Sequence, residues 1–344
     1  MTIHKENGKL AIYKKTEEKL RNAQYGVWNH STVDVCHWTK KALKGEGICY
    51  KRKFFGIETH RCMEFSPAGM YCHHRCIYCW RPTEFYNKVE MKSDEVDESE
   101  DIINHLLEER RKLLSGFGGN EKVDKEILKE AFKPSHFAIS LSGEPTLYPK
   151  LPELIKYLKS LPETKSIFLV TNGEEPEMLW RLEREDALPT QVYLSLNAGT
   201  KKTFEKISCP VVRDGWNKIM ESLNFIKETN TRTVIRITLI RGMNTHEEEI
   251  KAIAELIKRA NPHFVEAKSY MHVGYSTVRL KEDHMLDHKE VVEWMNKLLK
   301  YLPDFELMDE HKESRIIIIQ NKKRYVDRWI APLEDSTYYK KYRM

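Results

Sequence analysis

Residues 70–80 read MYCHHRCIYCW and carry the most specific chemical signal in the chain. They hold Cys72, Cys76 and Cys79 in the spacing C-x3-C-x2-C, and the aromatic Tyr78 comes directly before the third cysteine. Three thiolates in one loop can bind three corners of a cubic iron–sulfur cluster, and a fourth cysteine would complete an electron-transfer site. Because no fourth cysteine follows in this loop, the fourth iron is left open, and a reacting ligand can bind there.

The ligand that we expect at the open iron is S-adenosylmethionine. A structural zinc loop is the alternative, with His73 or His74 as a further ligand. Zinc usually takes four protein ligands, commonly as two spaced pairs of Cys and His, and the spacing here does not match the common zinc patterns. The sequence therefore favours a [4Fe–4S] cluster in this loop.

Three more cysteines precede the loop at a regular interval. Twelve residues separate Cys36 from Cys49, and twelve separate Cys49 from Cys62. Three buried thiols are the simplest interpretation, but free thiols are rarely grouped in this way. The regular spacing instead predicts a second [4Fe–4S] cluster, which again has three ligands and an open iron that can bind substrate.

Lys51 lies two residues from one of these proposed ligands, within the basic run Lys51-Arg52-Lys53. A lysine beside a metal cluster can have a lowered pKa and can form a Schiff base with a carbonyl substrate. A surface lysine in a basic run is the alternative, and the position in the sequence alone favours that alternative.

The composition predicts a soluble, cytoplasmic protein. The chain has 344 residues, of which 40% are hydrophobic and 32% are charged, so it can bury a large core beneath a heavily charged surface. No apolar run approaches the roughly 20 residues that span a bilayer, and the N-terminus lacks the apolar segment of a signal peptide. Seven cysteines, an odd number, in such a chain favour metal or catalytic use over a disulfide framework. Cys209 lies far from the other six and is expected to be a packing residue.

Charge is distributed unevenly along the sequence, although the net charge is only +5. Lys and Arg outnumber Asp and Glu by six over residues 1–60 and by five over residues 311–344, whereas residues 61–310 have a net charge of −6. Basic ends around an acidic middle favour a polyanionic partner, and nucleic acid is the natural candidate. Taken alone, these counts are explained equally well by ordinary charged side chains on a solvated surface.

Short apolar strands alternate with helices over the central part of the chain. Strands are expected near 63–65 and at 137–141, 167–170, 192–196, 233–240 and 264–270. This alternation predicts a parallel sheet, and six such units suit an incomplete (βα)6 barrel of the α/β class.

Other patterns lie outside the alternating units. An amphipathic helix is expected over residues 8–27 and a helical insertion over residues 92–133. Residues 305–308 and 315–320 are expected to form an antiparallel pair, which a basic tail follows. We therefore divide the chain into an N-terminal extension that bears part of the second cysteine group (1–60), the barrel (61–300) and a C-terminal segment (301–344).

Polar residues follow the predicted strands, at the edge where the carboxyl ends of parallel strands meet. Gly143 would let the backbone approach a ligand closely, and the Glu144 carboxylate could accept the ammonium hydrogens of S-adenosylmethionine. Arg236 and Thr238 alternate along one face of their strand and could point inward. Each residue alone could be a strand cap, but beside a cluster loop the cofactor interpretation prevails. The predicted site also includes Ser142, and it includes Asn172, Ser195 and Asn197 for the ribose hydroxyls and the methionine carboxylate.

These motifs resemble those of known enzymes. The C-x3-C-x-Y-C loop, followed by a strand that ends in Gly143-Glu144, is similar to the radical S-adenosylmethionine superfamily. The upstream cysteines, CYK at 49–51, LSGEPT at 141–146, TNG at 171–173 and SLNA at 195–198 resemble more narrowly the archaeal tRNA 4-demethylwyosine synthases. The eukaryotic relatives carry an N-terminal flavodoxin-like FMN domain, for which there is no room before Cys36. The resemblance therefore implies an external electron donor of the flavodoxin or ferredoxin type.

The resemblance implies a radical reaction on tRNA. A cluster at Cys72, Cys76 and Cys79 donates an electron to S-adenosylmethionine, which breaks into methionine and a 5′-deoxyadenosyl radical. The radical takes a hydrogen atom from the methyl group of N1-methylguanosine, the nucleotide 3′ of the anticodon in tRNA for phenylalanine. The methylene radical adds to pyruvate, two of whose carbons are retained, and the 4-demethylwyosine ring closes. Tyr78 would contact the adenine of the cofactor.

The resemblance also gives the upstream residues a role. Cys36, Cys49 and Cys62 would hold the second [4Fe–4S] cluster, and Lys51 corresponds to the family lysine proposed to form a Schiff base with pyruvate. The open iron of the second cluster remains an alternative binding group for pyruvate.

The expected partners are tRNA that contains N1-methylguanosine, pyruvate and the electron donor, with no membrane contact and a monomeric enzyme. The modified base must be unstacked to reach the barrel, while Lys and Arg bind the backbone phosphates. Two alternatives remain open at this point. One is another two-cluster radical S-adenosylmethionine enzyme with a different substrate, and the other is a zinc-stabilised RNA-binding protein without catalysis.

Overall fold

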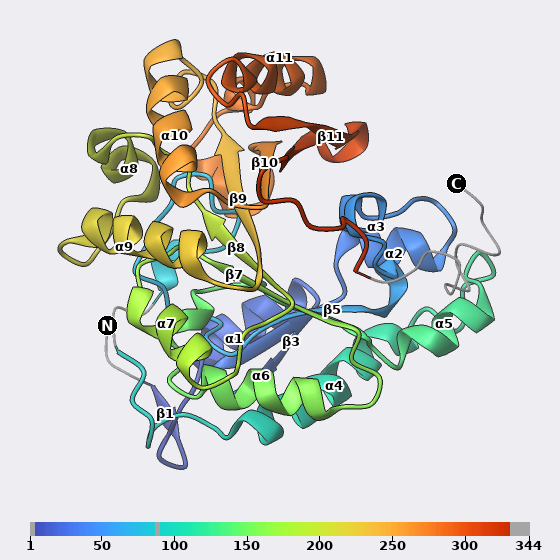
Figure 1. Cartoon of the computed structure of the whole chain (residues 1–344). Coiled ribbons are helices and arrows are strands. Elements are labelled where there is room, and N and C mark those ends of the chain that lie inside the picture. The colour runs from blue at the N-terminus through green and yellow to red at the C-terminus, as the bar shows by residue number, and fades with distance from the viewer. Residues whose placement is uncertain (1–3, 87–89, 331–344) are drawn as a thin grey trace.

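The computed structural model of the protein describes residues 4–86 and 90–330, and a curved sheet of ten strands runs through it (Figure 1). The strand order is β11-β12-β10-β9-β8-β7-β6-β5-β4-β3. The six central strands are parallel to one another and confirm the predicted sheet. They are β5 (Cys62–Ser66), β6 (His136–Ile139), β7 (Ser166–Thr171), β8 (Gln191–Ser195), β9 (Arg232–Leu239) and β10 (Phe264–Ser269).

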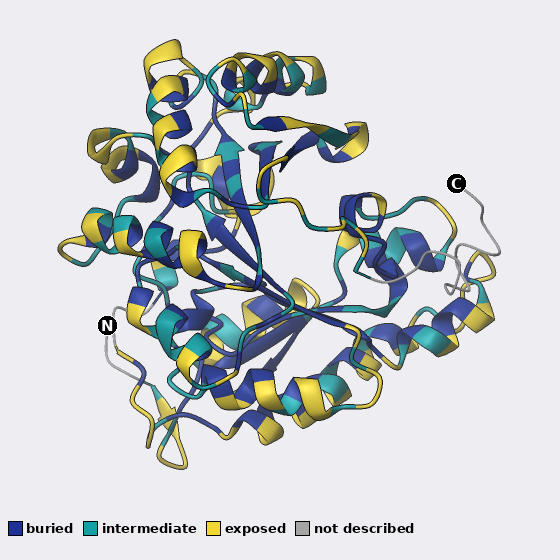
Figure 2. Ribbon diagram, in the orientation of Figure 1, coloured by how far each residue is buried: buried dark blue, intermediate teal, exposed yellow. Residues whose placement is uncertain are grey.

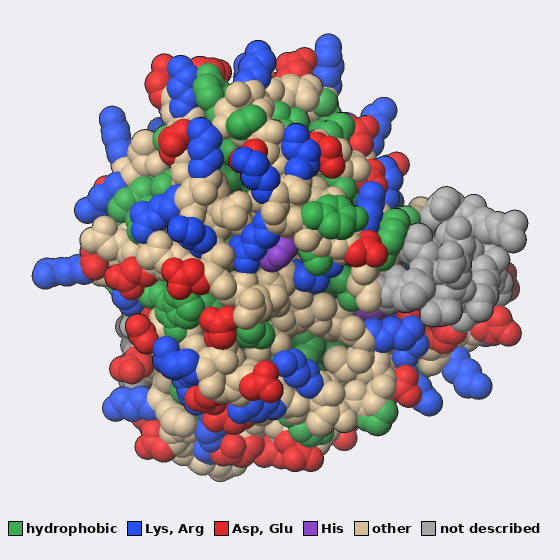
Figure 3. All heavy atoms as spheres, in the orientation of Figure 1, with side chains coloured by type: hydrophobic (Ala, Val, Ile, Leu, Met, Phe, Trp, Pro, Cys, Tyr) green, Lys and Arg blue, Asp and Glu red, His purple; other side chains and the backbone are tan. Residues whose placement is uncertain are grey.

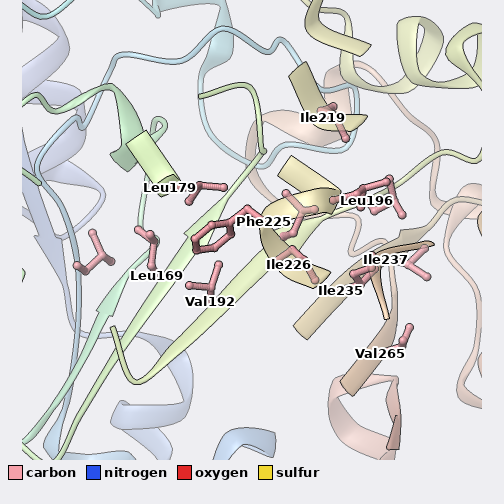
Figure 4. Close-up of a cluster of buried hydrophobic side chains, with 14 of the residues drawn as sticks. Leu169, Leu179, Val192, Leu196, Ile219, Phe225, Ile226, Ile235, Ile237 and Val265 are labelled. Carbon is pink, nitrogen blue, oxygen red and sulfur yellow. The ribbon is translucent and has the colours of Figure 1, made fainter. Parts of the chain in front are cut away.

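Helices cover the outer face of this sheet. Side chains alternate between the two faces of a strand, and one set packs against the helices. Leu169 of β7, Val192 of β8 and Ile235 of β9 share a buried cluster with Leu179 of α7 and Phe225 of α9 (Figure 4). The helices that follow the strands are α6 (Leu151–Ser160), α7 (Pro176–Arg184), α8 (Lys201–Ser208), α9 (Gly215–Glu228), α10 (Glu247–Ala260) and α11 (His288–Leu299).

A second apolar cluster covers the inner face of the same strands. Phe168 of β7, Tyr193 of β8 and Phe264 of β10 pack with Phe54 of the short helix α3 (Tyr50–Phe55). In Figure 1, α3 and α2 (His37–Leu43) lie to the right of the sheet, on the side opposite to α7 and α9. Figure 2 shows that the strands between these layers are buried. The inner face therefore holds α3, the helix that carries Lys51.

The segments on either side of the predicted barrel add strands to the same sheet. β3 (Tyr25–Trp28) and β4 (Ser31–Asp34) form a hairpin that pairs antiparallel with β5, and the sequence pattern does not predict this hairpin. β11 (Phe305–His311) and β12 (Ile316–Asn321) confirm the predicted antiparallel pair, and β12 also pairs antiparallel with β10. Residues from all three segments that we defined therefore share one sheet.

The predicted N-terminal helix is shorter than expected. α1 spans Lys14–Asn22, and a two-stranded hairpin of β1 (Lys5–Glu6) and β2 (Lys9–Leu10) precedes it. The predicted basic tail continues past residue 330 and so lies partly outside the described residues. On the face shown in Figure 3, Lys and Arg side chains lie among Asp and Glu side chains.

The predicted helical insertion over residues 92–133 contains two helices, α4 (Ser99–Ser115) and α5 (Lys125–Ala131), joined by turns. α4 packs against β3, β4 and α6. Arg110 of α4 is buried and donates hydrogen bonds to the backbone oxygens of His60 (3.3 Å) and Cys62 (3.1 Å). The insertion therefore supports the start of β5. None of the helices in the described ranges has both the length and the apolar composition needed to cross a bilayer.

Candidate active site

The cysteine loop, residues 70–80, follows β5 at its carboxyl end, where the sequence predicts a cofactor. The backbone N–H of Arg75 donates to the oxygen of Ser208 over 3.0 Å. The guanidinium of Arg279 donates to the backbone oxygens of Cys76 (2.8 Å) and Cys79 (2.7 Å) and so fixes the second half of the loop. Arg279 lies far from the loop in the sequence, and no local pattern singles it out.

The three thiols of the loop lie together, with Cys76 buried and Cys72 and Cys79 half-buried. Burial and the nearby Cys76 thiol raise the pKa of Cys79 to about 12. Burial also raises the pKa of Cys72 well above its usual range, and the charges of Glu144 and Cys76 add to this effect. Buried thiols that would repel one another as thiolates suit a metal cluster, because ligation replaces their protons with cationic metal. The side chains therefore fit the predicted [4Fe–4S] cluster.

His73 and His74, which could serve as zinc ligands, both face carboxylates. His74 Nε2 lies 2.9 Å from Glu174 Oε1, and His73 Nδ1 lies 3.5 Å from Glu175 Oε1. These contacts join the cysteine loop to the segment that follows β7.

Glu144 connects the carboxyl ends of β6 and β7. Its carboxylate accepts hydrogen bonds from Thr146 N (3.2 Å), Thr146 Oγ1 (2.6 Å), Thr171 Oγ1 (2.7 Å) and Asn172 N (2.7 Å). The neighbouring Ser142 Oγ lies 3.0 Å from Thr32 Oγ1 of β4. In this structure Glu144 is thus directed to protein donors and organises the strand ends around the cysteine loop.

Replacing Gly143 with alanine should destabilise the protein strongly. Gly143 has a φ of +68°, and a Cβ there would lie 1.8 Å from Ala68 O and 2.7 Å from Tyr71 O. Backbone oxygens cannot move away at low cost, so we expect the thermal unfolding midpoint to fall by roughly 5–10 °C. Gly242→Ala is the matched control, because Gly242 has a φ of +75° but open space around it. Calorimetry that gave equal shifts for both variants would contradict the close approach at Gly143.

Other predicted residues gather around the cysteine loop. Asn172 Nδ2 lies 3.8 Å from Cys72 Sγ. Asn197 Nδ2 donates to Tyr78 Oη over 2.7 Å, and Asn197 Oδ1 accepts a hydrogen bond from Thr238 N over 2.7 Å. Tyr78, Asn197 and Thr238 are thus directly connected beside the loop.

Arg236 points into the barrel, as expected, but it contacts α3 and not the cysteine loop. Its guanidinium donates to Glu266 Oε2 from Nε (3.1 Å) and from Nη2 (2.9 Å), and Nη2 also donates to Tyr50 Oη (2.8 Å). Ser195 pairs in register with Arg236. The contacts of Arg236 place it next to α3.

The upstream cysteines converge although they lie in three different elements. Cys36 precedes α2, Cys49 precedes α3, and Cys62 begins β5. Burial and the Cys36 thiol raise the pKa of Cys49 to about 12, and the same two causes raise the pKa of Cys62. The effect of one thiolate's charge on the pKa of another thiol weakens with distance, so the three thiols lie close together. All seven cysteines fall within the described ranges and are free, and this triad also fits a metal cluster.

Lys51 lies inside the barrel, and only 8% of its surface is exposed. Its Nζ is 4.7 Å from the ring centre of Phe168 and 5.1 Å from that of Tyr193. Burial raises the pKa of Glu64 on β5, and the charge of Lys51 opposes this effect. The surface-lysine alternative is therefore wrong. The sequence pattern also missed Glu64, since it gives no sign that α3 enters the barrel.

Comparison with known proteins identifies relatives that cover most of the chain. Residues 67–257 match the family model of the Radical SAM superfamily, and residues 259–321 match the model described as Wyosine base formation. Over 293 residues the chain is 44% identical to the S-adenosyl-L-methionine-dependent tRNA 4-demethylwyosine synthase of Pyrococcus abyssi, covering 85% of this chain and 84% of that protein.

Two solved structures are also similar. A structure of TYW1 with a lysine–pyruvate adduct bound has a TM-score of 0.81 and 35% identity, over 92% of this chain and 99% of that one. A crystal structure of archaeal TYW1 has a TM-score of 0.75 and 32% identity over the same shares of the two chains.

The partial barrel, with its cysteine loop beyond the carboxyl end of β5, defines a radical S-adenosylmethionine enzyme, a class that uses this cofactor with an iron–sulfur cluster. The relatives and the second matched region are more specific. The chain belongs to the tRNA 4-demethylwyosine synthase family and is a tRNA-modifying enzyme of wyosine biosynthesis. The expected fold and enzyme class are confirmed, and the alternative of a zinc-stabilised protein without catalysis is wrong.

Proposed function

We propose that this enzyme condenses the N1-methylguanosine of tRNA with pyruvate to form 4-demethylwyosine, and that Lys51 captures the pyruvate. The observation that carries the proposal is the burial of the Lys51 ammonium inside the barrel, against the rings of Phe168 and Tyr193. A lysine in a desolvated pocket is a suitable nucleophile for a carbonyl group. The relative solved with a lysine–pyruvate adduct, 35% identical to this chain, supports this role.

The proposed capture step uses only the lysine and the keto acid. The Lys51 ammonium first releases one proton, and the lone pair of the resulting amine forms a C–N bond to the carbonyl carbon of pyruvate. The nitrogen passes a second proton to the carbonyl oxygen, which takes up the proton released at the start and leaves as water, so that a protonated imine remains. The rings of Phe168 and Tyr193 keep bulk water away from the imine, and their π faces favour its positive charge. Hydrolysis of the captured pyruvate is thereby slowed.

In this proposal the two cysteine groups have separate functions. Cys36, Cys49 and Cys62 hold a second [4Fe–4S] cluster close to Lys51. Cys72, Cys76 and Cys79 would hold the first cluster, which together with S-adenosylmethionine would supply the radical chemistry needed to remove a hydrogen atom from the N1-methyl group. The residues that we assign to the S-adenosylmethionine site are Tyr78, Ser142, Gly143, Asn172, Ser195, Asn197 and Thr238, with Glu144 holding the strand ends in place. Arg236 is assigned instead to the pyruvate side, because it contacts Tyr50 and Glu266.

The partners follow from this chemistry. The target base stacks inside the anticodon stem-loop, so it must be unstacked to enter the barrel, and Lys and Arg at the protein surface bind the neighbouring phosphates. Each turnover consumes an electron to cleave the cofactor, so an external flavodoxin- or ferredoxin-type protein delivers it. We propose that the enzyme acts as a monomer.

Anaerobic turnover with isotope-labelled pyruvate tests the proposal. The reconstituted enzyme would be mixed with S-adenosylmethionine, dithionite, uniformly ¹³C-labelled pyruvate and tRNA that contains N1-methylguanosine. Mass analysis of the digested nucleosides should show 4-demethylwyosine that carries two labelled carbons. A matched tRNA with unmethylated guanosine should give no product. Formation of 5′-deoxyadenosine without any labelled nucleoside would overturn the proposed substrates.

A further inference from the structure

A second lysine projects into the chamber that holds Lys51. Lys268 lies on β10 in register with Thr238 of β9. Strand alternation puts Lys268 on the same face as Phe264 and Glu266, which is the inner face. Its Nζ lies 5.8 Å from the ring centre of Tyr50, the residue directly before Lys51 on α3. The two lysines thus come from opposite walls of one chamber.

Ring contacts agree with this shared position. Lys51 Nζ faces the ring of Tyr193 at 5.1 Å, and Lys268 Nζ faces the ring of Tyr50. Arg236 joins the two rings, because its guanidinium lies 4.4 Å from the ring centre of Tyr193 and donates to Tyr50 Oη over 2.8 Å. Both ammonium groups therefore lie around the same pair of tyrosine rings.

The other charged groups of the chamber already have partners. Arg236 and Glu266 form an ion pair over 2.9 Å, and Arg236 also donates to Tyr50. Glu64 accepts a hydrogen bond from Ser140 Oγ over 3.3 Å. In residues 4–86 and 90–330, by contrast, neither lysine ammonium forms a hydrogen bond or an ion pair. Three cations, Lys51, Lys268 and Arg236, thus share this space with two carboxylates, Glu64 and Glu266, and the excess of buried positive charge suits an anionic ligand.

An α-keto acid has two groups that such a pair of lysines can recognise. Its carbonyl carbon reacts with one amine, and the carboxylate on the adjacent carbon needs a cation close by. Arg236 is held by Glu266 and is therefore less available than Lys268. We propose that Lys268 binds the carboxylate of the keto acid whose carbonyl reacts with Lys51, and that it thereby selects α-keto acids over neutral ketones. This inference rests on the proposed capture of pyruvate by Lys51.

Reductive trapping separates the two roles without requiring turnover. Cyanoborohydride converts an imine on the protein into a stable amine, whose added mass is measured on the intact chain. The probes are pyruvate and methyl pyruvate, which keeps the carbonyl but lacks the charge. For Lys268→Met we expect the half-saturating pyruvate concentration to rise roughly 10- to 100-fold, the effect of losing one hydrogen-bonded charge pair. Trapping of methyl pyruvate should be unchanged.

The controls decide between this inference and simpler explanations. Lys268→Arg keeps the charge and should recover part of the affinity for pyruvate, and Lys258→Met, at an exposed lysine of α10 paired with Glu255, should behave as the wild type. If the wild type traps neither probe, the Lys51 proposal fails. If Lys268→Met traps both probes like the wild type, Lys268 does not bind the carboxylate. If Lys268→Met traps neither probe and also loses the iron of the second site, Lys268 is needed for cluster binding, and the inference is likewise overturned.

Discussion

Replacing Lys51 with alanine should lower the rate of 4-demethylwyosine formation by at least about 10³-fold, because the variant loses the amine that forms the C–N bond to the keto acid. Lys51 is buried against Phe168 and Tyr193, and alanine leaves that space without an amine. The cysteine loop lies beyond the carboxyl end of β5 and does not depend on this side chain. Cleavage of S-adenosylmethionine and the iron content should therefore stay near wild-type values. The measurement is single-turnover nucleoside analysis together with quantification of 5′-deoxyadenosine.

Lys53→Ala is the matched control for this prediction. Lys53 lies two residues further along α3, but its Nζ is exposed and pairs with Asp309 over 2.9 Å. An exposed ion pair of this kind contributes little to stability, so product formation should change less than about twofold. Full activity of Lys51→Ala, or equal losses in both variants, would show that the position of Lys51 in the barrel has no chemical role.

Single cysteine substitutions should separate the two metal sites. Cys72→Ala should lower the iron content from about eight to about four per chain, since each cubic cluster holds four irons. It should also abolish cleavage of S-adenosylmethionine. Cys62→Ala should lower the iron content by the same amount but leave reductive cleavage of the cofactor measurable, while product formation on tRNA is lost. Iron analysis and 5′-deoxyadenosine quantification on anaerobically reconstituted protein measure both effects.

Cys209→Ser serves as the control for these variants. Cys209 lies at the end of α8 and is half-exposed, and it contacts the cysteine loop through its backbone oxygen, which accepts a hydrogen bond from Arg75 N over 3.2 Å; the Cys209→Ser substitution leaves that contact in place. The serine variant should retain all the iron and the full rate. About four irons in the wild type would exclude a second cluster, and loss of all iron in Cys62→Ala would show that the two sites cannot be loaded independently.

The sequence predicts the parts of the fold that depend on local pattern. Alternation of apolar strands and helices predicts the six parallel strands, and the run of four isoleucines at 316–319 marks β12, the strand between β10 and the edge strand β11. The hairpin of β3 and β4 escapes prediction. Its strands have four residues each, and the polar Thr32 is buried where it pairs with Ser66 of β5. Short strands of this kind depend on long-range pairing, which leaves no periodic signal.

The difference between local pattern and long-range contact also decides which parts of the site could be predicted. Cysteine spacing identifies both groups of thiols, since ligands close together in the sequence leave a pattern. The sequence could not show that Arg236 turns towards Glu266, or that Lys268 and Glu64 share a chamber with Lys51. These residues come from β5, β9, β10 and α3, and only the closure of the sheet around α3 brings them together. The physical reason is that a barrel interior is assembled from distant strands, one or two residues from each.

Arg279 has a consequence for how such enzymes can be recombined. It lies in the region that matches Wyosine base formation, yet its guanidinium holds the backbone oxygens of Cys76 and Cys79 in the region that matches the Radical SAM superfamily. The C-terminal region therefore cannot be exchanged without affecting the Radical SAM region, because it holds the cysteine loop of that region in place. A chimera that joins residues 67–257 to the C-terminal part of another enzyme would need a donor at the same place. Without such a donor, the backbone oxygens of Cys76 and Cys79 would lose the guanidinium contact, and the chimera would lose the geometry of the cysteine loop before that of the new substrate pocket.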